Sequence, residues 1–410
     1  MKVTIALDHR FSRTPDGSVW TRTFFGPSFW DRYLGVFDRV EIVGRVREVK
    51  APENGWQRVD NRRVSVVGIP NYIGPWQFLI RMRKIRRAAS ESLINPEAVI
   101  LRVSSAVAGC LEPVLRRTGH PYGLEVVADP YDALAPGAVR HPLRPLLRWW
   151  FPRQLRHLCG NAAAVSYVTR AALQRRYPPS SKAYTTNYSS VELRDDAFFS
   201  EPRLYKPDLT AFSLIFVGTL EELYKAPDVL IGSVAACVHD GLDITLKVIG
   251  GGRARSVLEA RTAALNISDR VIFLGELPSG ARIRSELDNA DLFILPSRQE
   301  GLPRAMIEAM ARALPCIGST VGGIPELLGP EEMAPPGDPA ALTQKIRDVL
   351  GDPSRMTRLS AQNLAKALEY REELLQAKRL RFYREVQSRT AAWLSGAAVR
   401  RSRPVKAIAD

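Results

Sequence analysis

The sequence predicts an α/β protein with two parallel sheets, and three observations lead to this prediction. Short apolar runs rich in β-branched residues alternate with longer amphipathic stretches, which is typical of parallel strands joined by crossover helices. The chain has 410 residues, and because a domain usually has roughly 100–200 residues, a second hydrophobic core is expected. Residues 200–208 are polar, contain two prolines and lack an apolar period, as expected of a linker.

The expected strands fall into one set on each side of this linker. The first set covers residues 2–7, 40–43, 64–67, 98–103, 122–127 and 163–167. The second set covers residues 214–217, 244–249, 271–274, 292–295 and 315–317. We therefore expect one domain over residues 1–205 and another over residues 206–370. A helical pattern runs from Pro353 to about Thr390, and residues 371–410 should pack back on the first domain and end in a basic tail.

Composition indicates a globular protein of a reducing compartment. Hydrophobic residues make up 45% and charged residues 25% of the chain, which excludes a disordered, collagen-like or coiled-coil protein. No segment approaches the roughly 18 uninterrupted apolar residues of a membrane span, and residues 1–8 resemble a buried strand rather than a signal peptide. The cysteines are singly spaced, so we interpret them as buried structural residues: Cys110, Cys159, Cys237 and Cys316.

A strand–loop–helix junction near residue 300 carries the most information about function. The strand over residues 292–295 leads into a loop with Gly301, and a helix begins near Pro303. Such a helix start directs free N–H groups into the crevice beyond the strand, where ligands of open α/β sheets bind. Glu300 can reach sugar hydroxyls or a developing positive centre, and Glu308 can accept both hydroxyls of a ribose. The alternative is that Glu300 caps the helix and Glu308 lies on a solvated face.

The spacing of Glu300 and Glu308 resembles the Glu-x7-Glu hallmark of retaining nucleotide-sugar glycosyltransferases of the GT-B fold, specifically the large family 4. Further segments resemble that family in the same order: residues 216–230, 249–252, 271–275 and 318–326. The resemblance implies two Rossmann-like domains that face each other across a cleft, with the donor bound by the C-terminal domain and the acceptor by the N-terminal domain. It also implies attack on the face from which the diphosphate departs, with the leaving phosphate taking the acceptor's proton.

Within these segments the resemblance implies roles for single residues. Gly218 would let the backbone approach a phosphate, and Lys225 would neutralise the diphosphate. Thr219 stands where the family often has arginine, so the remaining diphosphate charge would be met by the helix start near Leu302 and by Arg304. The expected donor-binding residues are Gly218, Thr219, Lys225, Gly250, Leu277, Glu300, Gly301, Leu302, Arg304 and Glu308.

The sequence supports no other cofactor site. Gly250–Gly252 follows an expected strand, but Arg255 leaves the dinucleotide-binding fingerprint incomplete. A phosphate-binding Gly-x4-Gly-Lys motif is absent from the sequence, and so is an Asp-x-Asp pair of the kind that holds a divalent ion in metal-dependent glycosyltransferases. We therefore expect neither a metal nor a cofactor, and a nucleotide-diphosphate sugar as co-substrate.

The N-terminal half offers candidates for the acceptor side of the cleft. Residues 8–20 occupy the place of the family's glycine-rich loop after the first strand, with Gly17 as the expected backbone hinge. His9 could act as an acid or base, although a lone histidine at a strand end is more often a structural hydrogen-bonding residue. Asp129 stands where related enzymes carry a catalytic-site histidine; it either contacts the transferred sugar or starts a turn before Pro130, and the two interpretations are about equal.

Positive charge is concentrated in the first half of the chain. The formal net charge is +15, and residues 1–200 hold 30 Lys and Arg against 17 Asp and Glu. The excess clusters in residues 81–87 and residues 140–156, where Trp149 and Trp150 lie among arginines. Basic residues next to tryptophans are typical of a surface that binds anionic lipid. The alternative is that the tryptophans are buried and the arginines solvate a helix.

The predicted function is retaining transfer of a sugar from a nucleotide-diphosphate donor to a saccharide or lipid-linked saccharide, in bacterial surface polysaccharide or glycolipid synthesis. Glu300 and Asp129 are the expected catalytic residues. The enzyme should be cytoplasmic and peripheral on the inner face of the cell membrane. A nucleotide-sugar epimerase or phosphorylase of the same fold is one alternative. A basic nucleic-acid-binding protein is another, but the sequence lacks the known recognition modules, so we expect no nucleic-acid partner.

Overall fold

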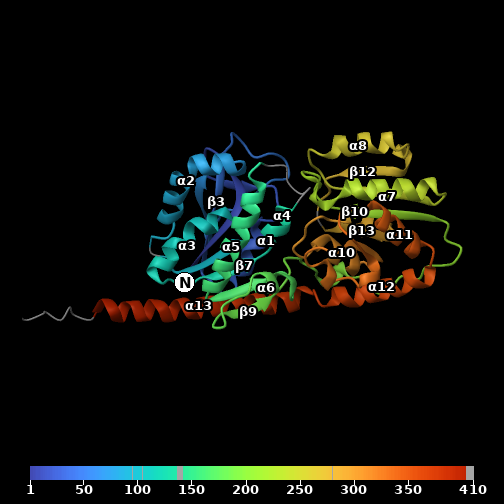
Figure 1. The fold of residues 1–410 in the computed structure, drawn as a ribbon. Helices are drawn as coiled ribbons and strands as arrows, with labels where there is room; N and C mark the ends of the chain where they lie inside the picture. Colours follow the sequence, from blue (N-terminus) through green and yellow to red (C-terminus); the bar gives the residue numbers. More distant parts are fainter. Residues whose placement is uncertain (95, 104, 136–141, 279, 403–410) are drawn as a thin grey trace, which may run out of the picture.

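The computed structural model describes residues 1–94, 96–103, 105–135, 142–278 and 280–402. Two α/β units lie side by side, and a long C-terminal helix runs along one side of the first unit (Figure 1). The predicted α/β class with two largely parallel sheets is therefore confirmed. In the described residues, no helix has the length and apolar character needed to cross a bilayer.

The first unit contains a nine-stranded sheet. Its strands are β1 (Lys2–Arg13), β2 (Val19–Thr21), β3 (Arg39–Glu48), β4 (Gln57–Arg58), β5 (Val64–Pro70), β6 (Ala98–Val103), β7 (Gly123–Val126), β8 (Ala164–Tyr167) and β9 (Tyr184–Asn187). β1 pairs in parallel with β3 and β6, and β7, β8 and β9 follow β6 in order. β2 is antiparallel to both β1 and β4. Each strand expected in this half is present, and the shorter strands β2, β4 and β9 were not predicted.

β1 differs most from the prediction. Residues 8–13 were expected to leave the sheet as a loop, but they continue the strand after a register shift between Ala6 and Arg10. They pair with β3 as far as Glu48, and β2 pairs with them from the other side. Gly17 therefore lies in the turn of a hairpin, where its φ of +86° requires glycine. The expected loop was wrong because alternating polar residues can form a strand when both of its edges are paired.

Helices of the first unit cover its sheet and join its strands. They are α1 (Pro27–Leu34), α2 (Gly74–Glu91), α3 (Ala106–Thr118), α4 (Pro130–Ala133), α5 (Arg144–Asn161) and α6 (Ala172–Arg176). α3 contacts α2, and Gly109 of α3 packs closely against Gln154 of α5. α3 thus lies next to both of the basic helices that the sequence pointed to.

The second unit contains a six-stranded parallel sheet in the order β12-β11-β10-β13-β14-β15. Its strands are β10 (Ala211–Val217), β11 (Asp243–Ile249), β12 (Val271–Gly275), β13 (Leu292–Leu295), β14 (Cys316–Ser319) and β15 (Met333–Ala334). Its helices are α7 (Pro227–His239), α8 (Arg255–Ala264), α9 (Ala281–Asp288), α10 (Arg304–Ala311), α11 (Pro339–Leu350) and α12 (Pro353–Leu368). The strand order reverses between β10 and β13, and ligands of such sheets bind at the carboxyl ends of the strands at this point.

The helix α13 (Glu372–Ser402) connects the end of the chain to the first unit (Figure 1). The guanidinium of Arg379 is fully buried and donates to the backbone oxygens of Ser189 and Val191. The Tyr383 ring packs against Tyr33 of α1. The helix continues past Thr390, where the sequence pattern was expected to end. The tail residues Arg403 and Lys406 lie outside the described residues, as does Arg140 of the second basic cluster.

The expected linker has no regular structure but is tied to the second unit. Arg203 donates to the backbone oxygens of Ala290, at 2.6 Å, and Arg312, at 2.9 Å. The Tyr205 hydroxyl donates to the oxygen of Asp291 at 3.0 Å. These contacts join the linker to the strand that leads toward residue 300, so the linker is a fixed part of the second unit rather than a free tether.

Candidate functional site

Two glycines form the floor of the candidate site at the ends of β10 and β11. The Gly218 N–H donates to the oxygen of Ile249 at 2.9 Å. Gly250 has a φ of +150°, and a Cβ at this position would lie 1.8 Å from the Gly218 oxygen. No side chain fits between the two strand ends, so the floor of the candidate site is bare backbone that a ligand can approach closely.

Lys225 lies above this floor and is paired with Glu300. Its Nζ lies 2.5 Å from Oε1 of Glu300, which also accepts from the Ser297 hydroxyl at 2.8 Å. Both side chains are largely buried, at 16% exposure for Lys225 and 7% for Glu300. The structure thus brings together the predicted phosphate-binding cation and the predicted catalytic carboxylate, and each satisfies the other's charge.

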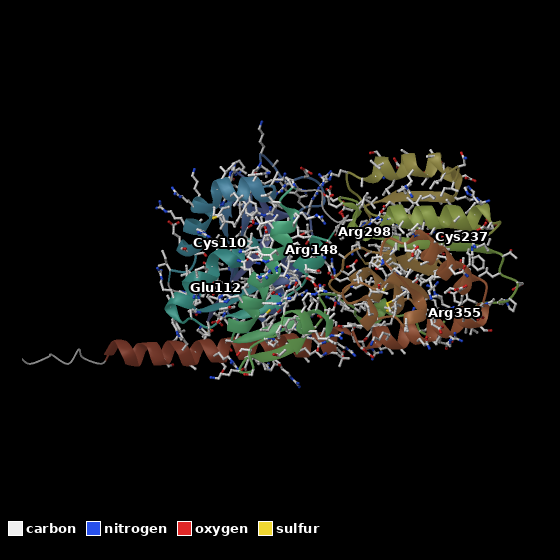
Figure 2. The ribbon with its side chains drawn as sticks, in the orientation of Figure 1. Cys110, Glu112, Arg148, Cys237, Arg298 and Arg355 are labelled. Carbon is white, nitrogen blue, oxygen red and sulfur yellow. The ribbon has the colours of Figure 1, made fainter. Side chains whose placement is uncertain are left out.

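Arg298 holds the segment that carries Lys225, a role that the sequence did not reveal. Its guanidinium makes a two-point ion pair with Asp228, at 2.8 and 2.7 Å, and donates to the Leu223 oxygen at 2.6 Å. Figure 2 shows Arg298 at the side of the second unit that faces the first. A two-point guanidinium–carboxylate pair fixes geometry as well as charge. Arg298 therefore sets the distance between Lys225 and Glu300.

The loop after Glu300 touches the first unit. A Cβ on Gly301 would lie 2.5 Å from the Val127 oxygen, directly after β7. The Gly323 N–H donates to the Gly301 oxygen at 2.6 Å, and a Cβ on Gly322 would lie 2.1 Å from the Glu300 oxygen. Backbone from both units and from the loop after β14 thus fixes Glu300 at the boundary between the units.

Glu308 lies on α10, one turn after Arg304. Its carboxylate accepts no hydrogen bond from the described residues, and burial raises the pKa of Glu308 while Arg304 opposes the rise. Leu302 is buried and Pro303 precedes the helix. The Glu308 side chain is half-buried, and a carboxylate in such a place with no donor among the described residues is suited to accept hydrogen bonds from a bound ligand.

Arg304 is directed at the first unit. Its guanidinium lies 4.2 Å from the ring centre of Phe24, and burial lowers its pKa. Apart from Glu308, the charges near it are Arg32, Arg102 and Glu192, all of the first unit. The expected contact of Arg304 with the donor diphosphate stays a prediction, since its neighbours are those of the opposite wall.

The other two residues predicted to bind the donor, Thr219 and Leu277, have uncharged side chains. The Thr219 hydroxyl accepts from the Glu221 N–H at 3.2 Å and so stabilises the turn after β10. Leu277 follows β12 and is partly buried against the core of the second unit. Either side chain can line a ligand without supplying charge, which leaves Lys225 as the cation nearest to the floor.

Asp129 is occupied by contacts within the first unit. Its carboxylate caps α4 by accepting from the Tyr131 N–H at 2.9 Å, and it also bonds the side chains of Arg176 and Tyr177. It is 5% exposed. These contacts are those of the turn-starting interpretation, and a direct contact of Asp129 with a sugar stays a prediction.

His9 is held in a polar and aromatic pocket. Its Nε2 lies 3.0 Å from the Thr21 hydroxyl, and its ring packs against Phe11 and Phe25. Burial, together with the charges of Arg45 and Arg10, lowers the pKa of His9 to about 4. The imidazole is therefore neutral at neutral pH, which fits the structural role better than the acid–base role. Gly17, the other residue predicted for the acceptor side, has no atom within 4 Å of where its Cβ would lie.

A carboxylate of the second unit holds the first unit in place. Glu326, at the end of the loop after β14, accepts from the N–H groups of Arg170, Ala171 and Ala172 at 2.6, 2.9 and 2.8 Å. These groups begin α6, so the carboxylate caps a helix across the boundary between the units. The Arg170 side chain pairs with Glu369, which strengthens the same junction.

The described residues contain no group of three or more His, Cys, Asp or Glu side chains that could hold a metal ion. The four cysteines are buried and free. Cys110 and Cys237 belong to different units and lie far apart in Figure 2. The cysteines thus pack as small apolar residues, as interpreted from their spacing.

The second unit is similar in sequence to known glycosyltransferases. Residues 211–352 match the family model described as Glycosyl transferases group 1. Protein CapJ of Staphylococcus aureus is 27% identical over 330 residues, which cover 78% of this chain and 80% of CapJ. The 2-deoxystreptamine glucosyltransferase of Streptomyces kanamyceticus is 34% identical over 125 residues, which cover 30% of this chain and 32% of that enzyme.

Solved structures resemble nearly the whole chain. The sucrose-phosphate synthase of Thermosynechococcus elongatus aligns with a TM-score of 0.70 at 18% identity, covering 95% of this chain and 99% of its own. Anabaena HepE, in complex with UDP and glucose, aligns with a TM-score of 0.60 at 15% identity, covering 96% of this chain and 99% of its own. These solved structures show that the fold is GT-B. The sequence matches support a glycosyltransferase enzyme.

Proposed function

We propose that this glycosyltransferase is a retaining, metal-independent enzyme of family 4. It moves a sugar from a nucleotide-diphosphate donor to a saccharide or a lipid-linked saccharide, in the synthesis of a surface polysaccharide or glycolipid. One observation carries the proposal: a single loop and helix present Glu300, paired with a cation, and Glu308, without a protein donor, above a floor of bare backbone. That arrangement fits a ligand with a diphosphate in the middle and hydroxyl groups at both ends.

Donor binding would exchange one ion pair for another. Lys225 would turn from Glu300 to the diphosphate, whose remaining charge would face the N–H groups at the start of α10. Glu308 would accept hydrogen bonds from the ribose hydroxyls. Glu300 would then be free to contact the transferred sugar, close to the positive charge that develops at its anomeric carbon.

The transfer itself needs little from the protein beyond position and charge. The bond between the anomeric carbon and the phosphate oxygen breaks, and the acceptor hydroxyl oxygen forms the new bond on the same face of the sugar. The acceptor's proton passes to the departing phosphate oxygen, so no second carboxylate is required. Asp129, three residues after the end of β7, would shape the opposite wall, and its direct contact with the transferred sugar stays a prediction.

Removal of the Glu308 carboxylate tests the donor site. Glu308→Ala should weaken binding of the nucleoside diphosphate by about 10- to 100-fold, because hydrogen bonds to a charged acceptor are worth roughly 1.5–3 kcal/mol. A thermal-shift screen over nucleoside diphosphates and their sugars identifies the base, and a titration of the best one measures the loss. Glu373→Ala removes an exposed carboxylate on α13 as a control. Equal binding by both variants would contradict the assignment of Glu308.

The membrane association that we propose rests on α2 and α5. Ile80 is 81% exposed, and Trp149 and Trp150 are 54% and 43% exposed, next to the basic residues of the same helices. The Arg153 guanidinium lies 4.2 Å from the Trp149 ring centre, so cation and ring share one surface. Such a surface suits the boundary between lipid headgroups and acyl chains.

Sedimentation with vesicles tests this surface. The wild-type chain should bind vesicles that contain phosphatidylglycerol and should not bind vesicles of phosphatidylcholine alone. Replacing both Trp149 and Trp150 with serine should weaken binding by about tenfold or more, because each ring loses apolar contact. Leu204→Ser is the control, since Leu204 is 83% exposed but belongs to the linker. An equal loss in the control, or no binding by the wild type, would refute the proposal.

A further inference from the structure

Four arginines gather around the unexpected extension of β1, and we call them the arginine row: Arg10 of β1, Arg22 directly after β2, and Arg45 and Arg47 of β3. Arg10 of β1 lies directly opposite Arg45 of β3 in the parallel register. On the other side of β1, the antiparallel register with β2 pairs Ser12 with Trp20, and the charge of Arg22, directly after β2, acts on Arg10. Like charges opposite each other destabilise a sheet. The pairing of Arg10 with Arg45 is therefore expected to destabilise the sheet, although the strands at this place are well paired.

The row holds four cations, but among the described residues only one of them, Arg45, forms an ion pair with an acid. Within the described residues the Arg10 side chain forms no hydrogen bond or ion pair, and its Nε is shielded from solvent without a partner. Asp8 pairs with Arg45 at 2.8 Å, and it is the acid that acts on Arg10. Burial, followed by the charges of Arg45, Arg47 and Arg22, lowers the pKa of Arg10. An unbalanced cation cluster of this kind is typical of a site that binds an anion.

Two tryptophans flank the row. Trp20 pairs with Ser12 and so lies on the face of the sheet that carries Arg10, two residues before Ser12. The Arg47 guanidinium lies 5.5 Å from the Trp56 ring centre and donates to the Ser12 hydroxyl at 3.0 Å. Both indoles are half-buried. An indole offers a flat apolar face with a polar edge, which suits the C–H face of a sugar ring.

The arginine row is connected through a short segment to Arg304, one of the residues predicted to bind the donor. Phe24 stands two residues after Arg22, and its ring contacts the Arg304 guanidinium at the start of α10. His9 hydrogen-bonds the hydroxyls of Thr21 and Thr23 and so holds the segment around Arg22 in place. A ligand on the row would thus approach the transferred sugar from the wall opposite to Glu308.

We propose that the arginine row binds an anionic group, a phosphate or a carboxylate, of the acceptor saccharide. A neighbouring sugar ring of the same acceptor packs on Trp20 or Trp56. This inference rests on the proposed function and adds the chemical class of the acceptor. It also explains why Arg10 and Arg45 lie opposite each other, because a bound anion would attract both side chains and so offset the repulsion between them.

Calorimetric titration of the full chain tests the inference, with the donor crevice filled by the nucleoside diphosphate that binds best. The probes are inorganic pyrophosphate, trigalacturonate and, as a neutral saccharide, maltotriose. At least one anionic probe should bind and maltotriose should bind more weakly. Arg10→Gln and Arg22→Gln should each weaken the anion by about tenfold, as expected for the loss of a charge-assisted hydrogen bond. Arg10→Lys should retain part of the affinity. The preferred probe distinguishes a phosphate from a carboxylate.

A second measurement separates binding from folding. Arg10→Gln should melt at the same temperature as the wild type or higher, because it removes a like-charge contact. Arg83→Gln, on the exposed surface of α2, is the matched control for loss of one charge. The inference is refuted if neither anion binds the wild type, if Arg10→Gln binds as well as the wild type, or if Arg83→Gln loses as much. Nucleotide binding measured in the same variants should not change; its absence from the wild type would instead refute the proposed function.

Discussion

Glu300→Ala should reduce the turnover number by about 10²- to 10³-fold, the loss typical of a group that stabilises charge in the transition state. The same variant should bind the nucleoside diphosphate at least as tightly as the wild type. The Lys225 ammonium lies 2.5 Å from the Glu300 carboxylate, and that ion pair must be given up for Lys225 to meet the diphosphate. Without Glu300, Lys225 is free to meet the diphosphate from the start. Turnover at saturating donor and a nucleotide titration measure the two effects.

Glu300→Gln provides the control for shape. Glutamine keeps the size of the side chain and can still accept from the Ser297 hydroxyl, but it carries no charge. If charge is what matters, Glu300→Gln should lose nearly as much turnover as Glu300→Ala. Turnover close to that of the wild type in either variant would remove Glu300 from the mechanism, whereas tighter nucleotide binding with slow turnover would support the exchange of Lys225 between two anions.

The opposite effects expected for the two acids follow from their positions along one segment. Glu300 stands in the loop at the boundary between the units, where its pairing with Lys225 and Ser297 must change during the reaction. Glu308 lies on α10, one turn after Arg304, and accepts no hydrogen bond from the described residues. It can therefore bind a ligand without first giving up a partner. Glu308→Ala should therefore act on affinity and Glu300→Ala on rate.

The strands of both sheets could be predicted because their signal is local. β6 and β13 are buried at every position, and continuous apolar runs of this kind mark strands that are covered on both faces. β2, β4 and β15 have two or three residues each and no apolar run of their own. The extension of β1 was missed for a related reason: residues 8–13 are strand only because β2 and β3 pair with them.

The loop and helix of the site could also be predicted, because glycine and glutamate at fixed spacing lie within one short segment. The contacts that complete the site join segments far apart in the chain. Arg298 pairs with Asp228, 70 residues earlier, and Glu326 caps a helix that begins about 150 residues before it. No local pattern reveals which of many surface acids and bases will meet, so these residues emerge only from the folded arrangement.

A deeply buried charge of the first unit is Glu125 of β7, which is 2% exposed. Its carboxylate accepts from Arg102 at 2.7 Å and from the hydroxyls of Tyr33, Tyr188 and Tyr383 at 2.9, 2.8 and 3.4 Å. Burial opposes ionisation, but the charge of Arg102 and these donors outweigh it, so the pKa of Glu125 is lowered. The donors come from β6, from α1, from the segment after β9 and from α13. One carboxylate thus joins the last helix of the chain to the centre of the first sheet.

Glu125→Leu should therefore lower the free energy of unfolding by about 3–5 kcal/mol, because it leaves Arg102 buried without a counter-charge. Chemical denaturation followed by tryptophan fluorescence measures the loss. The double variant Glu125→Leu, Arg102→Met should recover a large part of it, since an apolar pair of similar volume leaves no uncompensated charge. A single variant as stable as the wild type would contradict this account. Because Tyr383 is one of the donors, the single variant should also loosen α13, and faster proteolysis within residues 372–402 would then link the carboxylate to the docking of that helix.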